Sequence, residues 1–448
     1  MSSLPIDFVK RIQQDAFYPP QLLAALDTQA PTSVRLHPRR KQQLQLDQRV
    51  AWNQDGFYLS ERPSFTYDPF FHAGSYYPQE AGSMFLIQAL SALKLPEDPV
   101  ILDLSAAPGG KSTLIAAFLK QRGILIANEI IRSRAYILAE NLSKWGYSNT
   151  FVCNQSPEEL GVLQAKIDVL VVDAPCSGEG MFRKDVAARA EWTTAAAANC
   201  ALRQEDILEN TWPLIKENGF LIYSTCTFNP QENEALLKNF MEFHDAQVLQ
   251  PTRFEGMQAD RESIGNYFFP GQIQSEGFYI AILQKKSPEK TKGKTKAKPT
   301  NQQQKQDQRQ GDQISKTLPL TANLAHEFWT ENEQLFATTQ FAHHFFEQLP
   351  ALKWLKKGIH IAQLFKKSWA PAYDMVYTLD LNWELPKFEV EREQALQILH
   401  GESQMCDLPA GHYLITYKGE RIAMVKQLGQ RFNNLHPTEW RIRHLPKH

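Results

Sequence analysis

Short apolar runs alternate with helical patterns between residues 100 and 226. The runs have the length and the β-branched content of buried strands, and they cover residues 100–104, 124–129, 167–174 and 219–226. Residues 111–123 and 132–146 instead repeat apolar positions at helical spacing, and each of these segments ends at a glycine. Strands that alternate with helices in this way predict βα units in a doubly wound, Rossmann-like α/β sheet.

Pattern changes along the chain predict the limits of its other parts. We expect a small N-terminal α/β domain, the sheet domain, a C-terminal α+β extension and a small β-rich module, at residues 1–70, 71–284, 319–390 and 391–448. In the last part, two alternating runs meet at Lys418-Gly419, a pair typical of a tight hairpin turn. This turn predicts a β-barrel-like module at the end of the chain.

The segment between the sheet domain and the extension, residues 285–318, has almost no apolar residue and cannot bury a core. It carries ten Lys or Arg residues against three acidic ones. We therefore predict a basic flexible linker. A solvated spacer and an electrostatic contact with a polyanion are both compatible with this composition.

Composition and charge narrow the class of protein. With 43% hydrophobic residues, the chain of 448 residues has the composition of a soluble globular protein. No run of about 18 apolar residues indicates a membrane span, and Asp7 and Lys10 interrupt the start of the chain where a secretory signal would be apolar. We expect a cytoplasmic protein without a membrane partner. Because 48 basic residues balance 49 acidic ones, the overall charge gives no argument for nucleic acid.

The segment VILDLSAAPGGKST, residues 100–113, is the strongest candidate for a ligand site. It reads as a strand that ends at Asp103, followed by a turn of small residues that opens a helix. Gly109 and Gly110 let the backbone approach a ligand, and the helix start offers unpaired N–H groups. Glu129 ends the next strand, near the spacing at which an acid holds ribose hydroxyls in nucleotide-binding folds. These features predict a nucleotide-type cofactor.

A nucleoside triphosphatase is an alternative for the same segment. SAAPGGKS, residues 105–112, differs from the phosphate-binding loop G-x-x-x-x-G-K-[ST] only at Ser105. However, Pro108 lacks an N–H in a loop whose N–H groups should surround phosphates, and Ser105 would replace the glycine of the sharp turn. The pattern therefore favours the first interpretation.

Two cysteines follow neighbouring predicted strands. Asp173 and Cys176 lie after residues 167–174, and Cys226 ends the run at 219–226. A single free cysteine is often inert packing, and the five cysteines of the chain form no C-x-x-C pair that would indicate zinc. Ligand sites in such sheets lie at the carboxyl ends of the strands. Two thiols at that edge, beside a turn that binds a cofactor, therefore indicate a catalytic role for the cysteines and not a metal site.

One reaction needs such a pair of thiols beside an adenosine-containing cofactor. Carbon 5 of cytosine is too weak a nucleophile to attack a methyl sulfonium, but a thiolate that adds to carbon 6 makes carbon 5 nucleophilic. An acid near the base nitrogen must offset charge during the addition, and the hydrogen on carbon 5 must leave before the thiol is expelled. A carboxylate and a second thiol suit these tasks.

Four segments together resemble the Sun-type RNA (cytosine-5) methyltransferases. They are HAGSYYPQEAGSM, DLSAAPGGK, DAPCSGEGMFRKD and YSTCTFNPQENE, which begin at residues 72, 103, 173 and 223. Residues 358–373 and 431–443 resemble the C-terminal extension of one branch of that family, whose members act on small-subunit ribosomal RNA. The resemblance covers nearly the whole chain. It implies a methyltransferase that takes S-adenosylmethionine as cofactor and ribosomal RNA or a ribosomal subunit as partner.

The resemblance also implies the roles of individual residues. Cys226 would attack carbon 6, Cys176 would assist product release, Asp173 would lie between cofactor and base, and Lys111 would orient catalytic groups. The chemistry alone does not rank the two cysteines, because DNA cytosine-5 methyltransferases use the Pro-Cys thiol as nucleophile. The residues implied to hold S-adenosylmethionine are Ser105, Ala106, Ala107, Pro108, Gly109, Gly110, Lys111, Glu129, Asn154 and Asp173.

RNA contacts are expected at both ends of the chain. The N-terminal segment SVRLHPRRK, residues 33–41, matches an early basic segment of the family and is expected to contact the RNA backbone. In the last module, cations accompany an aromatic residue, as suits folded or single-stranded RNA: Lys426, Arg431, Trp440, Arg441 and Arg443. His37 and Gly271 depart from the family pattern, which has asparagine and histidine there. We expect a monomer that acts on RNA and not DNA; the alternative is a catalytically idle ribosome-assembly factor.

Overall fold

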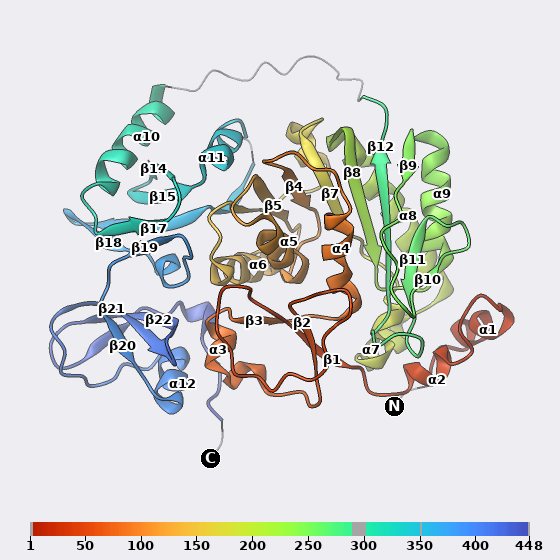
Figure 1. Ribbon diagram of the computed structural model, residues 1–448, viewed down its shortest axis with the longest axis horizontal. Helices are drawn as coiled ribbons and strands as arrows, with labels where there is room; N and C mark the ends of the chain where they lie inside the picture. The colour runs from red at the N-terminus through yellow and green to blue at the C-terminus, as the bar shows by residue number, and fades with distance from the viewer. Residues whose placement is uncertain (1–2, 289–301, 350–351, 447–448) are drawn as a thin grey trace.

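The computed structural model describes residues 3–288, 302–349 and 352–446. A ten-stranded sheet lies at its centre, in the order β10-β11-β12-β8-β7-β4-β5-β6-β16, with β9 paired to β12 (Figure 1). The strands of this sheet are β4 Val100–Asp103, β5 Ile124–Asn128, β6 Thr150–Cys153, β7 Ile167–Asp173, β8 Ile215–Thr225, β9 Ala246–Val248, β10 Gln258–Ala259, β11 Gly265–Phe268, β12 Phe278–Lys285 and β16 Trp354–Lys357. The helices of the same domain are α4 Leu86–Ser91, α5 Gly110–Leu119, α6 Arg132–Trp145, α7 Val186–Glu191, α8 Thr194–Thr211 and α9 Glu234–Phe243.

The middle of this sheet is parallel. Strand β4 pairs in parallel with β5 and β7, and β7 pairs in parallel with β8. In the β7–β8 register, Asp173 lies opposite Ser224. The loops that leave β7 and β8 therefore start side by side at one edge of the sheet, which is where such folds place their ligands.

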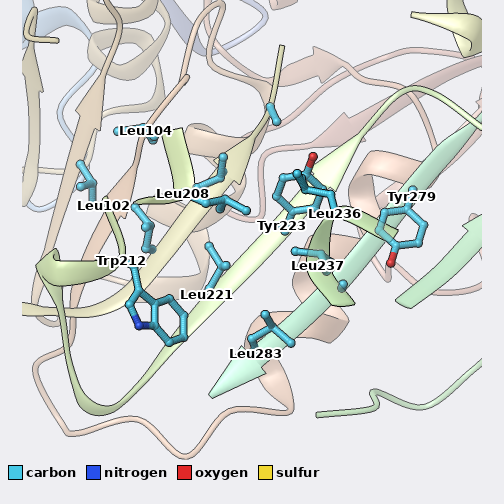
Figure 2. Close-up of a cluster of buried hydrophobic side chains, with 14 of the residues drawn as sticks. Leu102, Leu104, Leu208, Trp212, Leu221, Tyr223, Leu236, Leu237, Tyr279 and Leu283 are labelled. Atoms are coloured by element: carbon cyan, nitrogen blue, oxygen red, sulfur yellow. The ribbon is translucent and has the colours of Figure 1, made fainter. Parts of the chain in front are cut away.

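Helices cover both faces of the sheet. Leu102 of β4 belongs to a buried cluster that also contains Leu208 of α8 and Leu237 of α9 (Figure 2). Its neighbour Ile101 belongs to a second cluster with Leu114 of α5. Because successive strand residues point to opposite faces, α8 and α9 cover one face and α5 covers the other. Each fully buried leucine contributes about 1.5–3 kcal/mol to the stability of this arrangement. The predicted doubly wound α/β fold is confirmed.

The two predicted helix ends have different outcomes. Helix α6 ends at Trp145, and Gly146 follows it with a φ of 79°, as the sequence predicts. Helix α5 was expected to end at Gly123, which is wrong: it ends at Leu119, and Lys120 and Gln121 adopt left-handed conformations. Gly123 instead lies in the turn before β5, where a Cβ atom would come within 2.0 Å of the Pro99 carbonyl oxygen.

The N-terminal part is joined closely to the sheet domain. It contains α1 Ile6–Gln14, α2 Leu22–Leu26, α3 Pro69–His72 and a three-stranded sheet of β1 Thr32–Leu36, β2 Gly56–Leu59 and β3 Tyr76–Pro78. Strand β3 lies beyond residue 70, the limit expected from the sequence, and pairs with β1. Phe8 and Leu22 are buried in the same cluster as the strands of the ten-stranded sheet. The first helices thus pack as part of the central core.

The last module consists of a four-stranded sheet and one helix. Its elements are β20 Lys387–Glu389, β21 Gly411–Tyr417, β22 Glu420–Gln427, β23 Phe432–Asn434 and α12 Arg392–His400. Lys418 and Gly419 have φ values of 48° and 84° between β21 and β22, so the predicted hairpin turn is confirmed. Ile415 of this module shares a buried cluster with Val34 of the N-terminal sheet. The three-stranded sheet and α3 therefore pack beside the last module, whereas α1 and α2 lie on the other side of the molecule in Figure 1.

The C-terminal extension is also joined to the catalytic sheet. It contains β13 Leu320–Ala322, β14 Glu327–Glu331, β15 Gln334–Thr338, α11 Gln340–Glu347, β17 Ile359–Phe365, β18 Ser368–Pro371 and β19 Leu381–Trp383. Strand β16 pairs antiparallel with β6 and so forms an edge of the ten-stranded sheet. Removal of this extension would expose β6.

The predicted flexible linker is helical in its second half. Residues 302–315 form α10, Gln302–Ser315, whereas residues 289–301 lie outside the described part of the chain. Helix α10 packs on β14, where a Cβ atom at Gly311 would come within 2.6 Å of the Trp329 Cα atom. Ile314 packs against the buried cluster of the extension. The prediction of a flexible segment is wrong for residues 302–315, because this polar helix packs on β14 and hydrogen-bonds to it through Gln308. Among the described residues, no helix is long and apolar enough to cross a membrane.

Candidate functional site

A cavity of about 610 Å³ opens at the carboxyl ends of β4, β5, β7 and β8. Six of the residues predicted from the sequence line it: Ser105, Ala107, Glu129, Asp173, Cys176 and Cys226. The loop after β5 and the helix α8 supply other parts of its wall. A volume in this range is typical of sites for cofactor-sized molecules.

The turn between β4 and α5 forms part of the cavity floor. Gly109 has a φ of 119°, a conformation that residues with a Cβ atom rarely adopt, and this explains the glycine at the helix start. The turn is held by α6, because Asn141 donates to the Pro108 carbonyl and Arg134 donates to the Ala107 carbonyl. Four residues of the predicted cofactor set shape this turn without lining the cavity: Ala106, Pro108, Gly109 and Gly110.

Asp103 is a buried carboxyl group at the end of β4. The Ser112 hydroxyl donates to its Oδ2 atom over 2.6 Å, while its Oδ1 atom has no hydrogen-bond partner among the described residues. Burial raises the pKa of Asp103 to about 7, although the Ser112 hydrogen bond and the Lys111 charge oppose this shift. An unpartnered acceptor beneath the turn is suited to receive a donor or a cation from a bound molecule.

Glu129 and Asn154 lie at neighbouring strand ends but have different roles in the structure. Glu129 is buried at the cavity wall; its Oε1 atom accepts from the Ile131 N–H over 2.9 Å, and its Oε2 atom lies 3.6 Å from Arg134. The Asn154 amide donates to the carbonyls of Glu129 and Ile130 and does not line the cavity. The structure therefore places Asn154 as a brace for the loop that carries Glu129.

Lys111 and Asp173 form an ion pair beside the cavity. The Lys111 Nζ atom lies 2.7 Å from the Asp173 Oδ2 atom, and the Ser224 hydroxyl donates to Oδ1 over 3.0 Å. Burial opposes the Lys111 charge, but the charges of Asp173, Asp103 and Cys226 raise the pKa of Lys111 above its ordinary value. Lys111 therefore stays protonated beside Asp173.

The two cysteine sulfurs lie 3.2 Å apart, and both residues line the cavity. Neither is in a disulfide. The hydrogen bond to Cys226, burial and nearby negative charge raise the pKa of the Cys176 thiol well above its ordinary value. The two sulfurs are close enough for one thiol to donate a hydrogen bond to the other.

The triphosphatase interpretation of the same turn is not supported by the geometry. In a phosphate-binding loop, the lysine reaches the phosphates and the following hydroxyl binds magnesium. Here Lys111 pairs with Asp173, and the hydroxyl of Ser112 donates to the buried Asp103. Both side chains therefore bind carboxylates of the protein and not phosphate or magnesium.

Comparison with known families gives a consistent result for three parts of the chain. The family described as 16S rRNA methyltransferase RsmB/F matches residues 90–284, and the N-terminal and PUA domains described for RsmF match residues 4–81 and 385–442. The ribosomal RNA small subunit methyltransferase F of Aliivibrio fischeri (strain MJ11) is 30% identical over 405 residues, which cover 87% of this chain and 85% of that protein. The protein of the same name from Erwinia tasmaniensis is 30% identical over 406 residues, covering 87% and 84%.

The chain belongs to the RsmB/F methyltransferase family. The Sun-type resemblance inferred from the motifs is thereby confirmed. Among solved structures, a methyltransferase homolog protein from Pyrococcus horikoshii matches with a TM-score of 0.53 and 26% identity, over 62% of this chain and 94% of that chain. NSun6 from Pyrococcus horikoshii, crystallised with SFG, has the same TM-score of 0.53 at 20% identity, which shows the shared fold.

Members of the RsmB/F family use S-adenosylmethionine, and the cavity fits this group. S-adenosylmethionine carries a sulfonium and an ammonium, and three carboxylates surround the cavity and its floor: Asp103, Glu129 and Asp173. Glu129 and Asp173 line the cavity, whereas Asp103 is buried beneath the turn. Glu129, at the end of β5, has the position from which an acid holds ribose hydroxyls.

The basic segment at residues 33–41 differs from its prediction. Arg35 is 3% exposed; it donates to Gln79 over 2.8 Å and to Thr113 over 2.6 Å. Arg40 donates to the carbonyls of Ala73 and Tyr377. The prediction of an RNA-backbone contact is therefore wrong for these two arginines, whose charges are used to join segments within the protein.

The two departures from the family pattern lie away from the cavity. His37 is buried, where its Nε2 atom lies 3.1 Å from the Trp145 carbonyl oxygen, and burial holds its pKa well below the ordinary value. Gly271 has a φ of 88° and lies against α2, where a Cβ atom would come within 2.7 Å of Gln21 Cγ. Neither residue lines the cavity that holds the cysteines.

Sequence analysis missed several residues of the site. Arg203, Asp206 and Asn210 of α8 line the cavity. Their spacing of three and four residues places them on one helix face, a polar stripe that could have been recognised. Ser177 and Glu232, which bond to each other beneath the cysteines, carry no comparable signal because they lie in two separate loops.

Proposed function

We propose that the chain transfers a methyl group from S-adenosylmethionine to carbon 5 of a cytosine in small-subunit ribosomal RNA. One observation carries the proposal: two cysteine sulfurs lie 3.2 Å apart in the cavity, beside the ion pair of Lys111 and Asp173. A nucleophilic sulfur, a second thiol and a carboxylate are the groups that cytosine-5 methylation requires. The names of the relatives support ribosomal RNA as the substrate.

In the proposed reaction, Cys226 is the nucleophile. S-adenosylmethionine supplies an electrophilic methyl group when it is bound. The Cys226 sulfur adds to carbon 6 of cytosine and makes carbon 5 nucleophilic. Lys111 keeps its proton beside this site, where it holds the Asp173 carboxylate.

Cys176 and Asp173 act on protons and charge in the same scheme. After methylation, solvent water takes the proton from carbon 5, and the electrons of that C–H bond restore the double bond between carbons 5 and 6 as the bond to the Cys226 sulfur breaks. The Cys176 thiol donates to that sulfur and so stabilises the thiolate as it leaves. Asp173, held by Lys111 and Ser224, is oriented to accept a hydrogen bond from the base nitrogen once solvent has protonated it during addition.

We propose a separate role for each part of the chain. Residues 71–284 bind S-adenosylmethionine and carry out the chemistry. Residues 1–70 and 391–448 contact the RNA, the latter through exposed cations such as Arg431 and Arg443. We expect a monomer that meets its ribosomal substrate in the cytoplasm and does not act on DNA.

The test is methylation of defined RNA by the purified protein. The protein is incubated with S-adenosylmethionine and small-subunit ribosomal RNA, either naked or in assembled subunits, and bisulfite sequencing then locates 5-methylcytosine. The proposal predicts one or a few cytosines that are protected only when protein and cofactor are both present. No protected cytosine in either substrate, with a folded protein that binds the cofactor, would contradict it.

A further inference from the structure

A second cavity, of about 940 Å³, lies between α6 and the C-terminal parts of the chain. Its wall carries five aromatic rings from three parts of the molecule: Tyr136 from α6, Phe336, Trp354 and His360 from the extension, and Trp440 from the last module. None of the residues that line it takes part in the proposed reaction. The cavity has the size of a ligand site, and that reaction gives it no role.

The start of α6 separates this second cavity from the one that holds the cysteines. Ile131 and Arg134 line the cavity of the cysteines, whereas Ser133 and Ile137 line the second one. The step from residue 131 to residue 137 is about 9 Å of helix, at 1.5 Å per residue. A polymer bound beside Cys226 therefore has to cross less than two turns of α6 to enter the second cavity.

Exposed apolar side chains cover this part of α6. Ile130, Ile131, Tyr136 and Ile137 are each about half exposed to solvent. Arg132 donates to the Tyr136 hydroxyl over 3.1 Å, and its guanidinium carbon lies 5.8 Å from the centre of the Tyr136 ring. Grouped exposed apolar side chains mark interaction sites, and an aromatic ring beside a cation suits single-stranded nucleic acid.

The lysines that line the second cavity are bonded to groups of the protein. Lys357 lies 2.6 Å from the Glu331 carboxylate, and Lys356 is buried and donates to the Gly358 carbonyl. A phosphate group would need a cation whose charge is not already used. The aromatic faces and neutral polar groups of this wall instead suit a nucleobase, which is flat and uncharged.

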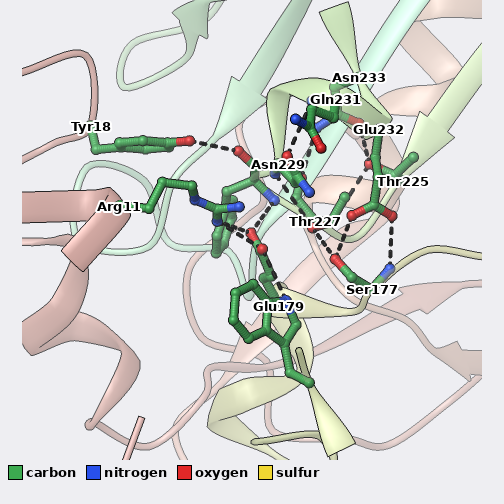
Figure 3. A network of polar contacts seen from close by, with 12 residues as sticks. Arg11, Tyr18, Ser177, Glu179, Thr225, Thr227, Asn229, Gln231, Glu232 and Asn233 are labelled. Atoms are coloured by element: carbon green, nitrogen blue, oxygen red, sulfur yellow. Dashed lines mark hydrogen bonds and ion pairs between the residues drawn. The ribbon is translucent and has the colours of Figure 1, made fainter. Parts of the chain in front are cut away.

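The loops that carry the cysteines use their polar side chains inside the protein. The buried Glu179 carboxylate accepts from Arg11 at 2.7 Å on both oxygens, and Glu232 accepts from the Ser177 hydroxyl over 2.5 Å (Figure 3). These groups are therefore engaged before any RNA binds. The start of α6 is the part of the cavity rim where exposed apolar side chains gather.

We propose that the second cavity binds an unpaired base of the same RNA strand that carries the target cytosine, and that this base stacks on Tyr136. The strand passes from the cavity of the cysteines over the start of α6, because the two cavities adjoin there. The base must be unpaired, since aromatic side chains stack on bases that have left the RNA helix. The inference rests on the proposed function, because it states where the neighbours of the target cytosine lie.

Binding of a short single-stranded RNA tests the inference without methyl transfer. The probe is a fluorescein-labelled oligocytidine of about 12 nucleotides, within the usual site size of single-strand binders, and fluorescence anisotropy gives its Kd. Tyr136→Ala should raise the Kd about 5- to 150-fold, as the loss of one stacked base does. The slope of log Kd against log salt should stay unchanged, because the ring contacts a base and not a phosphate.

Two further variants serve as controls. Tyr136→Phe keeps the ring and should retain the Kd of the unsubstituted protein within about threefold, because stacking needs only the aromatic face. Phe243→Ala removes an 82% exposed aromatic ring at the end of α9, which lines neither cavity, and should leave the Kd unchanged. Calorimetry with S-adenosylmethionine should give the same affinity in all variants, and circular dichroism establishes their folding.

An unchanged Kd in Tyr136→Ala, an equal loss in Phe243→Ala, a changed salt slope or a parallel loss of S-adenosylmethionine affinity would each overturn the inference. If Tyr136→Ala does not fold, ultraviolet crosslinking of the probe to the unsubstituted protein decides. RNA adducts on the peptide that contains Tyr136 support the inference, and adducts confined to other peptides overturn it. Because no methyl transfer is measured, failure of the inference leaves the proposed reaction at the cysteines standing.

Discussion

The carboxyl edge of the sheet and the basic segment at residues 33–41 use charge in different ways. At the sheet edge, Lys111 and Asp173 pair 2.7 Å apart, and Asp173 lines the cavity. In the basic segment, Arg35 donates to Gln79 and Thr113 and stacks 4.7 Å from the centre of the Trp145 ring. Its charge is used inside the protein.

This difference shows that residue type alone does not identify a binding residue. A cation beside a cavity is available to a ligand, whereas a cation with buried partners joins segments of the chain. Arg35 connects β1 to the first turn of α5, through the Thr113 hydroxyl and the Gly110 carbonyl. Substitutions in the two regions should therefore affect different properties: activity at the sheet edge and stability in the basic segment.

The largest expected effect is that of Asp173→Ala. Because the carboxylate orients Lys111 and faces the cavity, its loss should lower the methylation rate about a hundred- to ten-thousandfold, the range of general acid–base contributions. Incorporation of labelled methyl groups into RNA measures the rate, and thermal melting controls for folding. Near-normal turnover would remove Asp173 from the mechanism.

Asp103→Asn should change the pH dependence of stability. Asp103 has a pKa of about 7 in the folded protein against an ordinary 3.8, so the folded state keeps a proton that the unfolded chain has lost between these values. Stability of the unsubstituted protein should therefore fall as pH rises through this window. At about 1.4 kcal/mol per pKa unit, the asparagine variant should gain a few kcal/mol relative to it above pH 7. Urea unfolding at several pH values measures this, and parallel pH profiles would contradict it.

Glu129→Ala should mainly weaken cofactor binding. Loss of a hydrogen bond that a ribose hydroxyl donates to a charged carboxylate costs roughly 1.5–3 kcal/mol. This corresponds to about a ten- to hundredfold increase in Kd. Calorimetry with S-adenosylmethionine measures the change. Asn154→Ala provides a comparison, because the Asn154 amide braces the loop without lining the cavity. An unchanged Kd in Glu129→Ala would exclude the proposed ribose contact.

Two arginine substitutions test the comparison of regions directly. Arg35→Ala leaves buried groups of Gln79 and Thr113 without their partner and should cost about 1–3 kcal/mol of stability. Arg431→Ala removes an exposed cation of the last module and should change stability by less than about 0.5 kcal/mol while weakening RNA binding. Denaturant unfolding and RNA binding at matched salt measure both properties. Equal losses of RNA affinity from the two folded variants would contradict the distinction.

The sequence was sufficient to predict features that depend on local pattern. The ends of β4, β7 and β8 follow from apolar runs, and parallel strands bring their carboxyl ends to one edge, so Asp173, Cys176 and Cys226 could be placed at a common site. The turn at Lys418 follows in the same way, because its residue types select the turn conformation.

Features that depend on contacts between distant segments could not be predicted. Arg35 finds Thr113, which lies 78 residues later, and Ser177 finds Glu232, which lies 55 residues later. Strand β16 follows the predicted linker in the sequence and forms an edge of the ten-stranded sheet. Helix α10 lies inside the predicted linker. The pattern of residues within one segment does not show which distant segment it will contact. These contacts are therefore known only from the structure.

The most direct test of the account is the covalent state of each cysteine variant with RNA. Cys176→Ala and Cys226→Ala are each incubated with substrate RNA and S-adenosylmethionine and run on a denaturing gel. The account predicts a slow protein–RNA band from Cys176→Ala, because Cys226 attacks but is not released, and no band from Cys226→Ala. A stable band from Cys226→Ala alone would reverse the two roles, and no band from either variant would favour a catalytically idle ribosome-assembly factor.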